Sequence, residues 1–367
     1  MRCAAFAGPA LRLLLLAALI ASLSGCYVMQ AATGEWRVMR ARKPIDKVLA
    51  DPNTPSSLRE TLQEVEAARN FASKELNLPD NRSYRTYADV RRPYVVWNVV
   101  AAPEFSVHPK QWCFPIVGCV AYRGYFAEKN ARSFAAGLSQ RGFDVTLDGV
   151  PAYSTLGKFA DPVLSTMIRY GSDELAAIIF HELAHQLLYV KNDTQFNEAF
   201  ATTVENAGLE RWLAANGHSD RFQRYRKDST REREYVELLA QTRAQLAKLY
   251  ASGAPPEEMR EKKTATFEKL ASEIRDLEHR QGVHSTVYDQ WIKEGLNNAR
   301  LASEANYYDC VPGFERVLAD EGNDLMRFYA AARKLAKLPI AERHAKLCRT
   351  PAPLPTGEAA GAPGQAP

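Results

Sequence analysis

The chain has 367 residues, of which 46% are hydrophobic and 25% are charged, and its formal net charge is +4 at pH 7. These values are typical of a globular protein with one or two domains. Because Lys and Arg are interspersed with Asp and Glu along the chain, the charge pattern argues against a nucleic-acid-binding protein.

The N-terminus has the features of a signal peptide over residues 1–25. Basic residues flank and precede an apolar run at 13–23, which is too short to span a bilayer comfortably. The segment ends in Leu-Ser-Gly-Cys at 23–26, which resembles a bacterial lipobox. This resemblance implies lipid on Cys26 and, with Tyr27 next, attachment to the periplasmic face of an outer membrane. A plain secretory signal or a first transmembrane helix is the alternative.

A small mixed sheet with helices is predicted before residue 150. The apolar rhythm predicts helices from Arg37 to Leu49 and from Ser56 or Ser57 to about Leu76. β-Branched and aromatic runs predict strands at 94–101, 120–126 and 143–147, with a helix at 129–140 between the last two.

Four cysteines of the mature chain, Cys113, Cys119, Cys310 and Cys348, remain after Cys26. An even number in an oxidising compartment predicts two disulfides. Cys113 and Cys119 are the local pair, and Cys310 and Cys348 pair by elimination. A four-cysteine metal site is the alternative, although these spacings differ from those of zinc knuckles or ribbons.

The most informative segment is a predicted helix that begins near Ser172, a capping residue. It carries His181-Glu182-Leu183-Ala184-His185. Residues four apart lie on one helical face, so both imidazoles can bind one metal ion. Glu182 is placed to hold a water molecule rather than to bind the metal. This is the His-Glu-x-x-His motif of zinc peptidases, and Zn²⁺ is therefore the predicted cofactor.

A second helix is predicted from Asn192-Asp193-Thr194 and contains Asn197-Glu198-Ala199-Phe200-Ala201. Together with the first motif, it resembles the thermolysin-like and alanyl-aminopeptidase-like gluzincins. The resemblance implies that Glu198 is the third zinc ligand. Glu205, which matches a longer thermolysin-like spacing, is the alternative ligand, or it orients an imidazole from outside the ligand set. This chain has Thr202 at the position, one turn after the ligand, where thermolysin-like enzymes carry an acidic residue.

Residues 219–282 are rich in Arg, Lys and Glu with Leu at intervals, and Gly253-Ala254-Pro255-Pro256 breaks the pattern. They are predicted to form an antiparallel helical hairpin. Helices are expected to continue from Tyr288 to about Ala345. The Pro-, Ala- and Gly-rich residues 351–367 are predicted to be a disordered tail.

The chain as a whole resembles a family of bacterial putative aminopeptidase lipoproteins. The similar stretches are Trp112 to Cys119, Tyr122 to Phe126, and Tyr153-Ser154-Thr155-Leu156-Gly157. In gluzincins an edge strand pairs with the substrate backbone, and this role is assigned to Tyr153, Ser154, Thr155 and Gly157. An ordinary turn is the alternative. Tyr153, Tyr307 and Tyr308 are candidates for polarising the substrate carbonyl.

These observations predict an α+β, zincin-like fold with a small mixed sheet, an active-site helix and a mainly helical C-terminal lobe. The expected divisions are a signal peptide (1–25), a catalytic domain (26–215), a helical hairpin (216–285), C-terminal helices (286–350) and a tail (351–367). The predicted function is zinc-dependent hydrolysis of peptides in the periplasm, with Glu182 accepting the proton of the attacking water. The alternative is a zinc-binding lipoprotein scaffold without catalytic activity.

Overall fold

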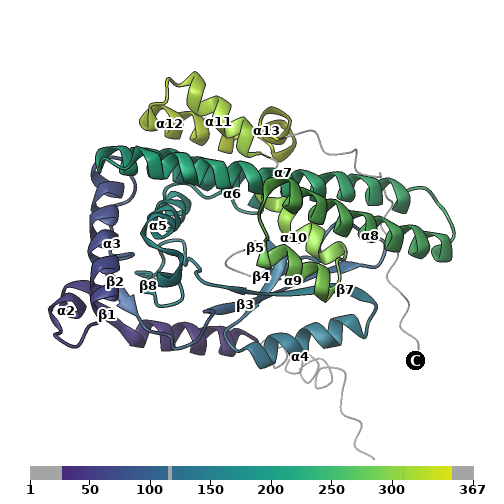
Figure 1. The fold of residues 1–367 in the computed structure, drawn as a ribbon, viewed down its shortest axis with the longest axis horizontal. Helices are drawn as coiled ribbons and strands as arrows, with labels where there is room; N and C mark the ends of the chain where they lie inside the picture. The colour runs from purple at the N-terminus through teal and green to yellow at the C-terminus, as the bar shows by residue number, and fades with distance from the viewer. Residues whose placement is uncertain (1–26, 115–117, 309, 349–367) are drawn as a thin grey trace, which may run out of the picture.

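Helices form most of the chain, and small sheets lie among them (Figure 1). The computed structural model describes residues 27–114, 118–308 and 310–348. Its strands are β1 (Arg42–Pro44), β2 (Thr86–Ala88), β3 (Val96–Pro103), β4 (Trp112–Phe114), β5 (Gly118–Val120), β6 (Tyr122–Tyr125), β7 (Phe143–Val150) and β8 (Val163–Leu164).

A first helix covers residues 27–41. It is followed by α2 (Ile45–Ala50), α3 (Ser56–Lys74), α4 (Glu128–Ser139), the 3-10 turn η1 (Ile168–Tyr170), α5 (Ser172–Leu187), α6 (Thr194–Ala215), α7 (Ser219–Tyr250), α8 (Pro256–Gln281), α9 (Thr286–Glu294), α10 (Asn298–Tyr308), α11 (Val311–Asp320), α12 (Leu325–Ala336) and α13 (Ile340–Leu347). This mixture of helices and short strands confirms the predicted α+β class.

The antiparallel sheet β6-β3-β7 contains the longest strands. Its central strand β3 is the apolar run predicted from the sequence, and it pairs with β6 at Val100 and Tyr122 and with β7 over its whole length. In a second sheet, β2 pairs antiparallel with β1 and parallel with β8, and β4 and β5 form a hairpin. The strands β1, β2, β4 and β8 were not predicted, because two or three residues are too few to show a period of two.

The predicted helix from Arg37 to Leu49 is interrupted, so that prediction is wrong in its middle. The first helix ends at residue 41, and β1 separates it from α2. Pro44 has no N–H to donate and disfavours helical angles for the residue before it. Within the interruption, at the start of β1, Arg42 Nη1 donates a hydrogen bond to the carbonyl of Ala160 at 2.8 Å.

The predicted strand over 120–126 is two strands in different sheets. β5 ends at Val120 and pairs with β4, whereas β6 begins at Tyr122 and pairs with β3. Ala121 separates them, and the residue pattern of 120–126 does not show this change of partner.

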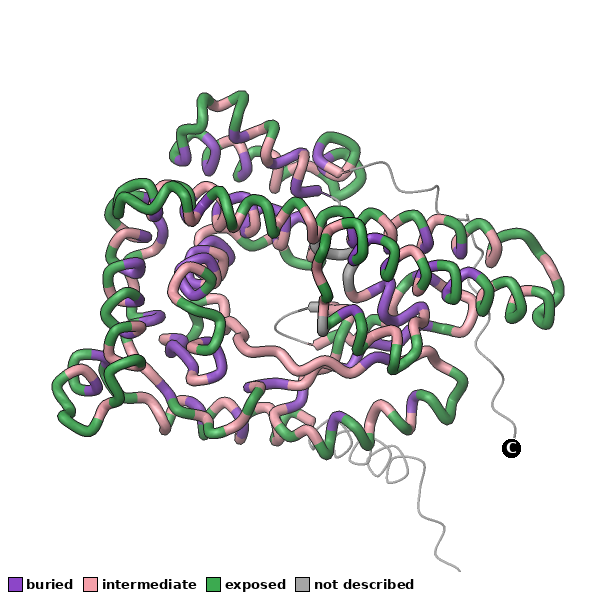
Figure 2. The backbone as a smooth tube through the Cα atoms, in the orientation of Figure 1, coloured by how far each residue is buried: buried purple, intermediate pink, exposed green. Residues whose placement is uncertain are grey.

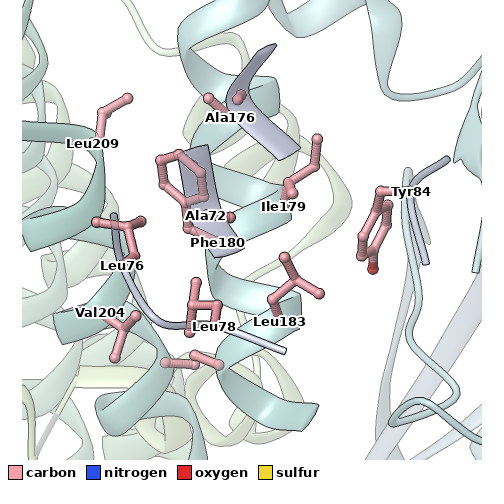
Figure 3. Close-up of a cluster of buried hydrophobic side chains, with 14 of the residues drawn as sticks. Ala72, Leu76, Leu78, Tyr84, Ala176, Ile179, Phe180, Leu183, Val204 and Leu209 are labelled. Atoms are coloured by element: carbon pink, nitrogen blue, oxygen red, sulfur yellow. The ribbon is translucent and has the colours of Figure 1, made fainter. Parts of the chain in front are cut away.

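The main core lies between α3, α5 and α6. Figure 3 shows Leu76, Phe180, Leu183 and Val204, from three segments of the chain, packed into one cluster, and each of the four is fully buried. In Figure 2 the outward face of α3 is exposed, whereas most of α5 and of α6 is buried or intermediate. Helix α5 therefore lies inside the molecule, with α3 and α6 as its supports.

The predicted helical hairpin is present as α7 and α8, which extend side by side to the right in Figure 1. The hairpin has a core of its own, which includes Tyr235, Leu239, Leu246, Phe267 and Leu270. Among the described residues, no helix combines the length and the apolar character that are needed to cross a membrane.

Both predicted disulfides are present, between Cys113 and Cys119 and between Cys310 and Cys348. The first closes the β4-β5 hairpin, and the second ties α11 to the end of α13. The lipidation predicted at Cys26 and the tail at 351–367 lie outside the described residues, as do the side chains of Tyr307 and Tyr308.

Candidate metal centre

Helix α5 carries the first part of the site. It begins after Gly171, whose φ of 85° suits glycine, so Ser172 is the first helical residue and not the predicted cap. Leu175, Ile179, Phe180 and Leu183 are buried on one side of the helix. Since these residues fix the rotation of the helix in the core, the imidazoles of the motif turn toward α6.

Helix α6 carries the second part, and polar side chains fix its start. Asp193 caps the helix and accepts a hydrogen bond from the Phe196 amide at 3.2 Å. The buried Asn197 side chain bonds to both the N–H and the C=O of Val190, at 2.7 and 2.8 Å. Asn197 therefore holds the loop between the helices in one conformation, and this places the next residue, Glu198, opposite α5.

Three donor atoms converge between these helices, from His181, His185 and Glu198. The two Nε2 atoms are 3.1 Å apart, and the Glu198 oxygens lie 3.3 Å from the His181 Nε2 and 3.6 Å from the His185 Nε2. A tetrahedral zinc ion with bonds of about 2.0–2.1 Å has ligand atoms about 3.4 Å apart along each edge. The observed separations lie on both sides of this value, so the three residues fit a zinc ion.

Glu205 lies outside this group and supports it. Its Oε2 is 2.8 Å from the Nδ1 atom of His181, and Tyr225 donates a hydrogen bond to its Oε1 at 2.8 Å. Burial lowers the pKa of His181, but the carboxylates of Glu198 and Glu205 outweigh this effect and raise the pKa. Glu198 thus lies beside the Nε2 atoms of both histidines, whereas Glu205 lies at the opposite nitrogen of the His181 imidazole.

Glu182 turns toward the loop that follows β7. It is partly exposed, and its negative charge contributes to the raised pKa values of Tyr84 and Asp161, both of which are 2% exposed. Burial is the main cause for Asp161, whose pKa is raised to about 6. Glu182 therefore lies near enough to Tyr84 and Asp161 for its charge to affect both groups.

The segment from Tyr153 to Gly157 is a loop and a turn and not an edge strand, which agrees with the alternative of an ordinary turn. The Thr155 amide and hydroxyl bond to Asp161 at 3.1 and 2.8 Å, and the Ser154 hydroxyl is 3.4 Å from the same carboxylate. These bonds hold the segment in a turn, so it does not present a row of free backbone N–H and C=O groups as an edge strand would.

Two members of this loop have structural contacts of their own. The Tyr153 hydroxyl bonds to Glu35 of the first helix, so it is already engaged. Gly157 has a φ of 74°, and a Cβ there would come within 3.2 Å of the Gln186 side chain on α5. Glycine thus permits the loop to lie against the helix that carries the motif.

Two tyrosines that the sequence did not single out lie near the metal-binding atoms. Desolvation raises the pKa of Tyr122, and the charge of Glu198 adds to the shift. The Tyr189 ring is 6.4 Å from that of His185, and Glu198 also raises the pKa of this tyrosine. Tyr189 could have been found, because it follows His185 by four residues in the sequence. Tyr122 could not, because β6 brings it from a distant part of the sequence.

A cavity of ≈ 960 Å³ runs from Tyr122 along the face of the β6-β3-β7 sheet. Asn98 and Asp148 line it from the strands, and Trp291 and Arg300 line it from α9 and α10. Arg300 bonds to Asp148 at 2.8 Å, so the cationic group is paired.

Comparison with known proteins identifies one family. The family model described as "Putative aminopeptidase" matches residues 26–347. No curated protein and no solved structure matches the chain significantly. The family match includes both helices of the metal centre and the helical hairpin.

Proposed function

Because the chain belongs to the putative aminopeptidase family, we propose that it is a zinc-dependent peptidase that works in the periplasm. The observation that carries the metal proposal is the spacing of 3.1, 3.3 and 3.6 Å between the donor atoms of His181, His185 and Glu198. Two imidazoles and one carboxylate are a ligand set of catalytic zinc, which leaves one position open.

The residues around His181, His185 and Glu198 have different roles in the proposed hydrolysis. A zinc ion held there would supply Lewis acidity for a water molecule and for the peptide carbonyl. Glu182 accepts the proton of the attacking water and delivers it to the leaving amine. Glu205 holds the ring of His181 through Nδ1, and Tyr225 holds Glu205. This support keeps the Nε2 atom of His181 directed at the metal.

The proposed location is the periplasmic face of the outer membrane, through lipid on Cys26. The lipobox-like sequence at 23–26 supports this attachment. The family match begins at the same cysteine, which is consistent with a mature chain that starts there. Two disulfides also fit an oxidising compartment.

Glu182→Gln tests whether the site is catalytic. The substitution keeps the shape of the side chain and removes its basic carboxylate, so zinc content should be unchanged while peptide hydrolysis falls by roughly 10²–10⁴-fold. Metal analysis and a peptide-cleavage assay on the same preparations measure both quantities. Glu210→Gln, at an exposed position of α6, is the matched control and should have normal activity.

The same variant separates an enzyme from a scaffold in the cell. A deletion strain should not be complemented by Glu182→Gln if the protein acts as a peptidase. Full complementation by a zinc-loaded variant that does not cleave peptides would overturn the proposal and favour a structural role.

A further inference from the structure

The outward face of the first helix, residues 27–41, is exposed in the part of the chain that the structure describes, and it carries large apolar side chains. Val28 is 58% exposed, Met29 67% and Trp36 56%. With 3.6 residues per turn, Val28, Met29, Ala32, Trp36 and Arg40 fall within an arc of roughly 120°. All five are exposed, so the helix presents a continuous apolar stripe that ends in a cation.

The opposite face of this helix holds it firmly against the protein. The Gln30 side chain bonds to the carbonyl of Gly124 and the amide of Phe126, each at 3.3 Å. A Cβ on Gly34 would come within 2.1 Å of the Phe126 ring, so glycine permits this close approach. Val38 is buried. The exposed stripe is therefore not needed for docking the helix.

The charges on this helix suit an anionic surface. Its only acidic residue, Glu35, lies at the border between the stripe and the docked face, where it is half-buried and accepts the hydrogen bond of Tyr153. Arg37 and Arg40 are exposed, and the Arg40 guanidinium lies 4.9 Å from the centre of the Trp36 ring. A tryptophan beside an arginine is a combination found at membrane interfaces, where the ring enters the headgroup layer and the cation meets the phosphates.

The preceding chain brings this helix to a membrane. The apolar run at 13–23 and Cys26 lie directly before it in the sequence. Val28 and Met29 are two and three residues from Cys26. They are therefore close to the attachment point whether lipid on Cys26 or the apolar run itself holds the chain at the membrane. No other exposed apolar residues of the described chain lie as close to the proposed attachment point.

We propose that the stripe formed by Val28, Met29, Ala32, Trp36 and Arg40 lies in the headgroup layer of an anionic lipid surface. The helix then fixes the orientation of the whole molecule, because it is bonded to β6 through Gln30 and β6 carries Tyr122. In Figure 1 this helix and α4 lie along the lower edge of the molecule, and α11–α13 lie at the opposite edge. The inference rests on the membrane attachment proposed above and is independent of peptidase activity.

The decisive measurement is tryptophan quenching in vesicles that contain brominated lipids. The full-length protein is isolated from membranes and reconstituted into phosphatidylcholine vesicles with and without phosphatidylglycerol. The brominated lipids should quench the wild type, and Trp36→Phe should lose most of the quenching. Trp212→Phe, which removes a ring packed on Phe71 in the core, should retain it. Equal quenching of wild type and Trp36→Phe would overturn the proposal.

Accessibility provides a second test that does not depend on fluorescence. Met29→Cys should be protected from a membrane-impermeant maleimide in vesicles and labelled in detergent. Ile340→Cys, at a position that is 49% exposed on α13, should be labelled in both. Equal labelling of the two variants in vesicles would show that the helix stands away from the lipid.

Charge is tested separately. Removing one cation near an anionic surface weakens its attraction by about fivefold, so Arg40→Ala should reduce the extra quenching that phosphatidylglycerol causes. Lys337→Ala, at an exposed position after α12, should leave it unchanged. An unaltered lipid dependence in Arg40→Ala would contradict the anionic part of the proposal. A protein that fails to reconstitute at all would instead contradict the attachment itself.

Discussion

Glu198 and Glu205 lie seven residues apart on one helix, yet they have different partners. Glu198 faces the Nε2 atoms of both histidines, whereas Glu205 meets only the Nδ1 atom of His181. Burial raises the pKa of Glu198, but the two histidines outweigh it and hold the pKa below its usual range. Glu198 is therefore ionised, as a metal ligand must be.

This difference predicts an order of zinc affinities. Glu205→Ala should weaken zinc binding by roughly 10–100-fold, the usual effect of removing a group that orients a ligand. Glu198→Ala should weaken it more, because a metal–ligand bond is lost. Competition titrations with a chelator measure both affinities, with Glu210→Ala on the same helix as the control. The reverse order would make Glu205 the ligand.

Asp161 should make stability depend on pH. Its pKa is raised from 3.8 to about 6 in the folded protein, so the folded state holds the proton more tightly than the unfolded state. The free energy of unfolding should therefore fall as pH rises from about 3.8 to about 6 and stay level above, a change of about 3 kcal/mol for this group.

Asp161→Asn removes this titration. Chemical denaturation of wild type and variant between about pH 4 and pH 7 should show a stability difference that changes over this interval. A difference that is constant with pH would mean that Asp161 does not titrate in this range. Asp144→Asn, on β7, provides a comparison at a carboxylate in a different part of the structure.

At the scale of the elements, the two disulfides restrain very different lengths of chain. Cys113 and Cys119 are 6 residues apart and close one hairpin, and the Cys119 amide bonds to Asn192 at 3.2 Å, just before α6. Cys310 and Cys348 are 38 residues apart and enclose α11, α12 and α13. Those helices lie along α6, which carries Glu198.

The longer loop should give the larger stabilisation. Loop-closure entropy predicts a loss of about 4 kcal/mol for Cys310→Ala with Cys348→Ala, and about 2 kcal/mol for Cys113→Ala with Cys119→Ala. Equilibrium unfolding in denaturant measures both, and the reduced wild type shows their joint effect. A larger loss from the short loop would imply that contacts of the hairpin, and not chain entropy, determine its contribution.

For the whole molecule, the proposed attachment at Cys26 can be tested directly. Cys26→Ser should abolish lipid incorporation and release the protein from the membrane fraction, because no other thiol follows the apolar run at 13–23 closely. Metabolic labelling with a fatty acid and cell fractionation measure these outcomes. Cys3→Ser, which lies within the predicted signal peptide, should change neither. Continued attachment of Cys26→Ser would mean that another part of the chain binds the membrane.

The arrangement of the whole chain supports both helices of the candidate metal centre. Asp193, which caps α6, also bonds to His344 of α13 at 2.8 Å. The C-terminal helices thereby hold the start of the helix that carries Glu198, and α3 packs on α5 from the other side. Both helices of the site are supported by segments far away in the sequence.

The sequence alone determined the features that depend on neighbours along the chain. The spacing of His181 and His185 follows from one helical turn, and the longer helices and β3 follow from their apolar periods. The sequence favoured Glu198 and named Glu205 as the alternative, because local motifs cannot measure the distance between two helices.

The tertiary structure decided what depends on contacts between distant segments. It brought Glu198 to the Nε2 atoms and Glu205 to Nδ1, and it placed Tyr122 near Glu198 through the pairing of β3 and β6. It also folded the segment from Tyr153 to Gly157 into a loop, because the amide and the hydroxyl of Thr155 donate hydrogen bonds to Asp161. Such contacts form only when packing of the core fixes where each helix lies, and a periodic pattern carries no information about that position.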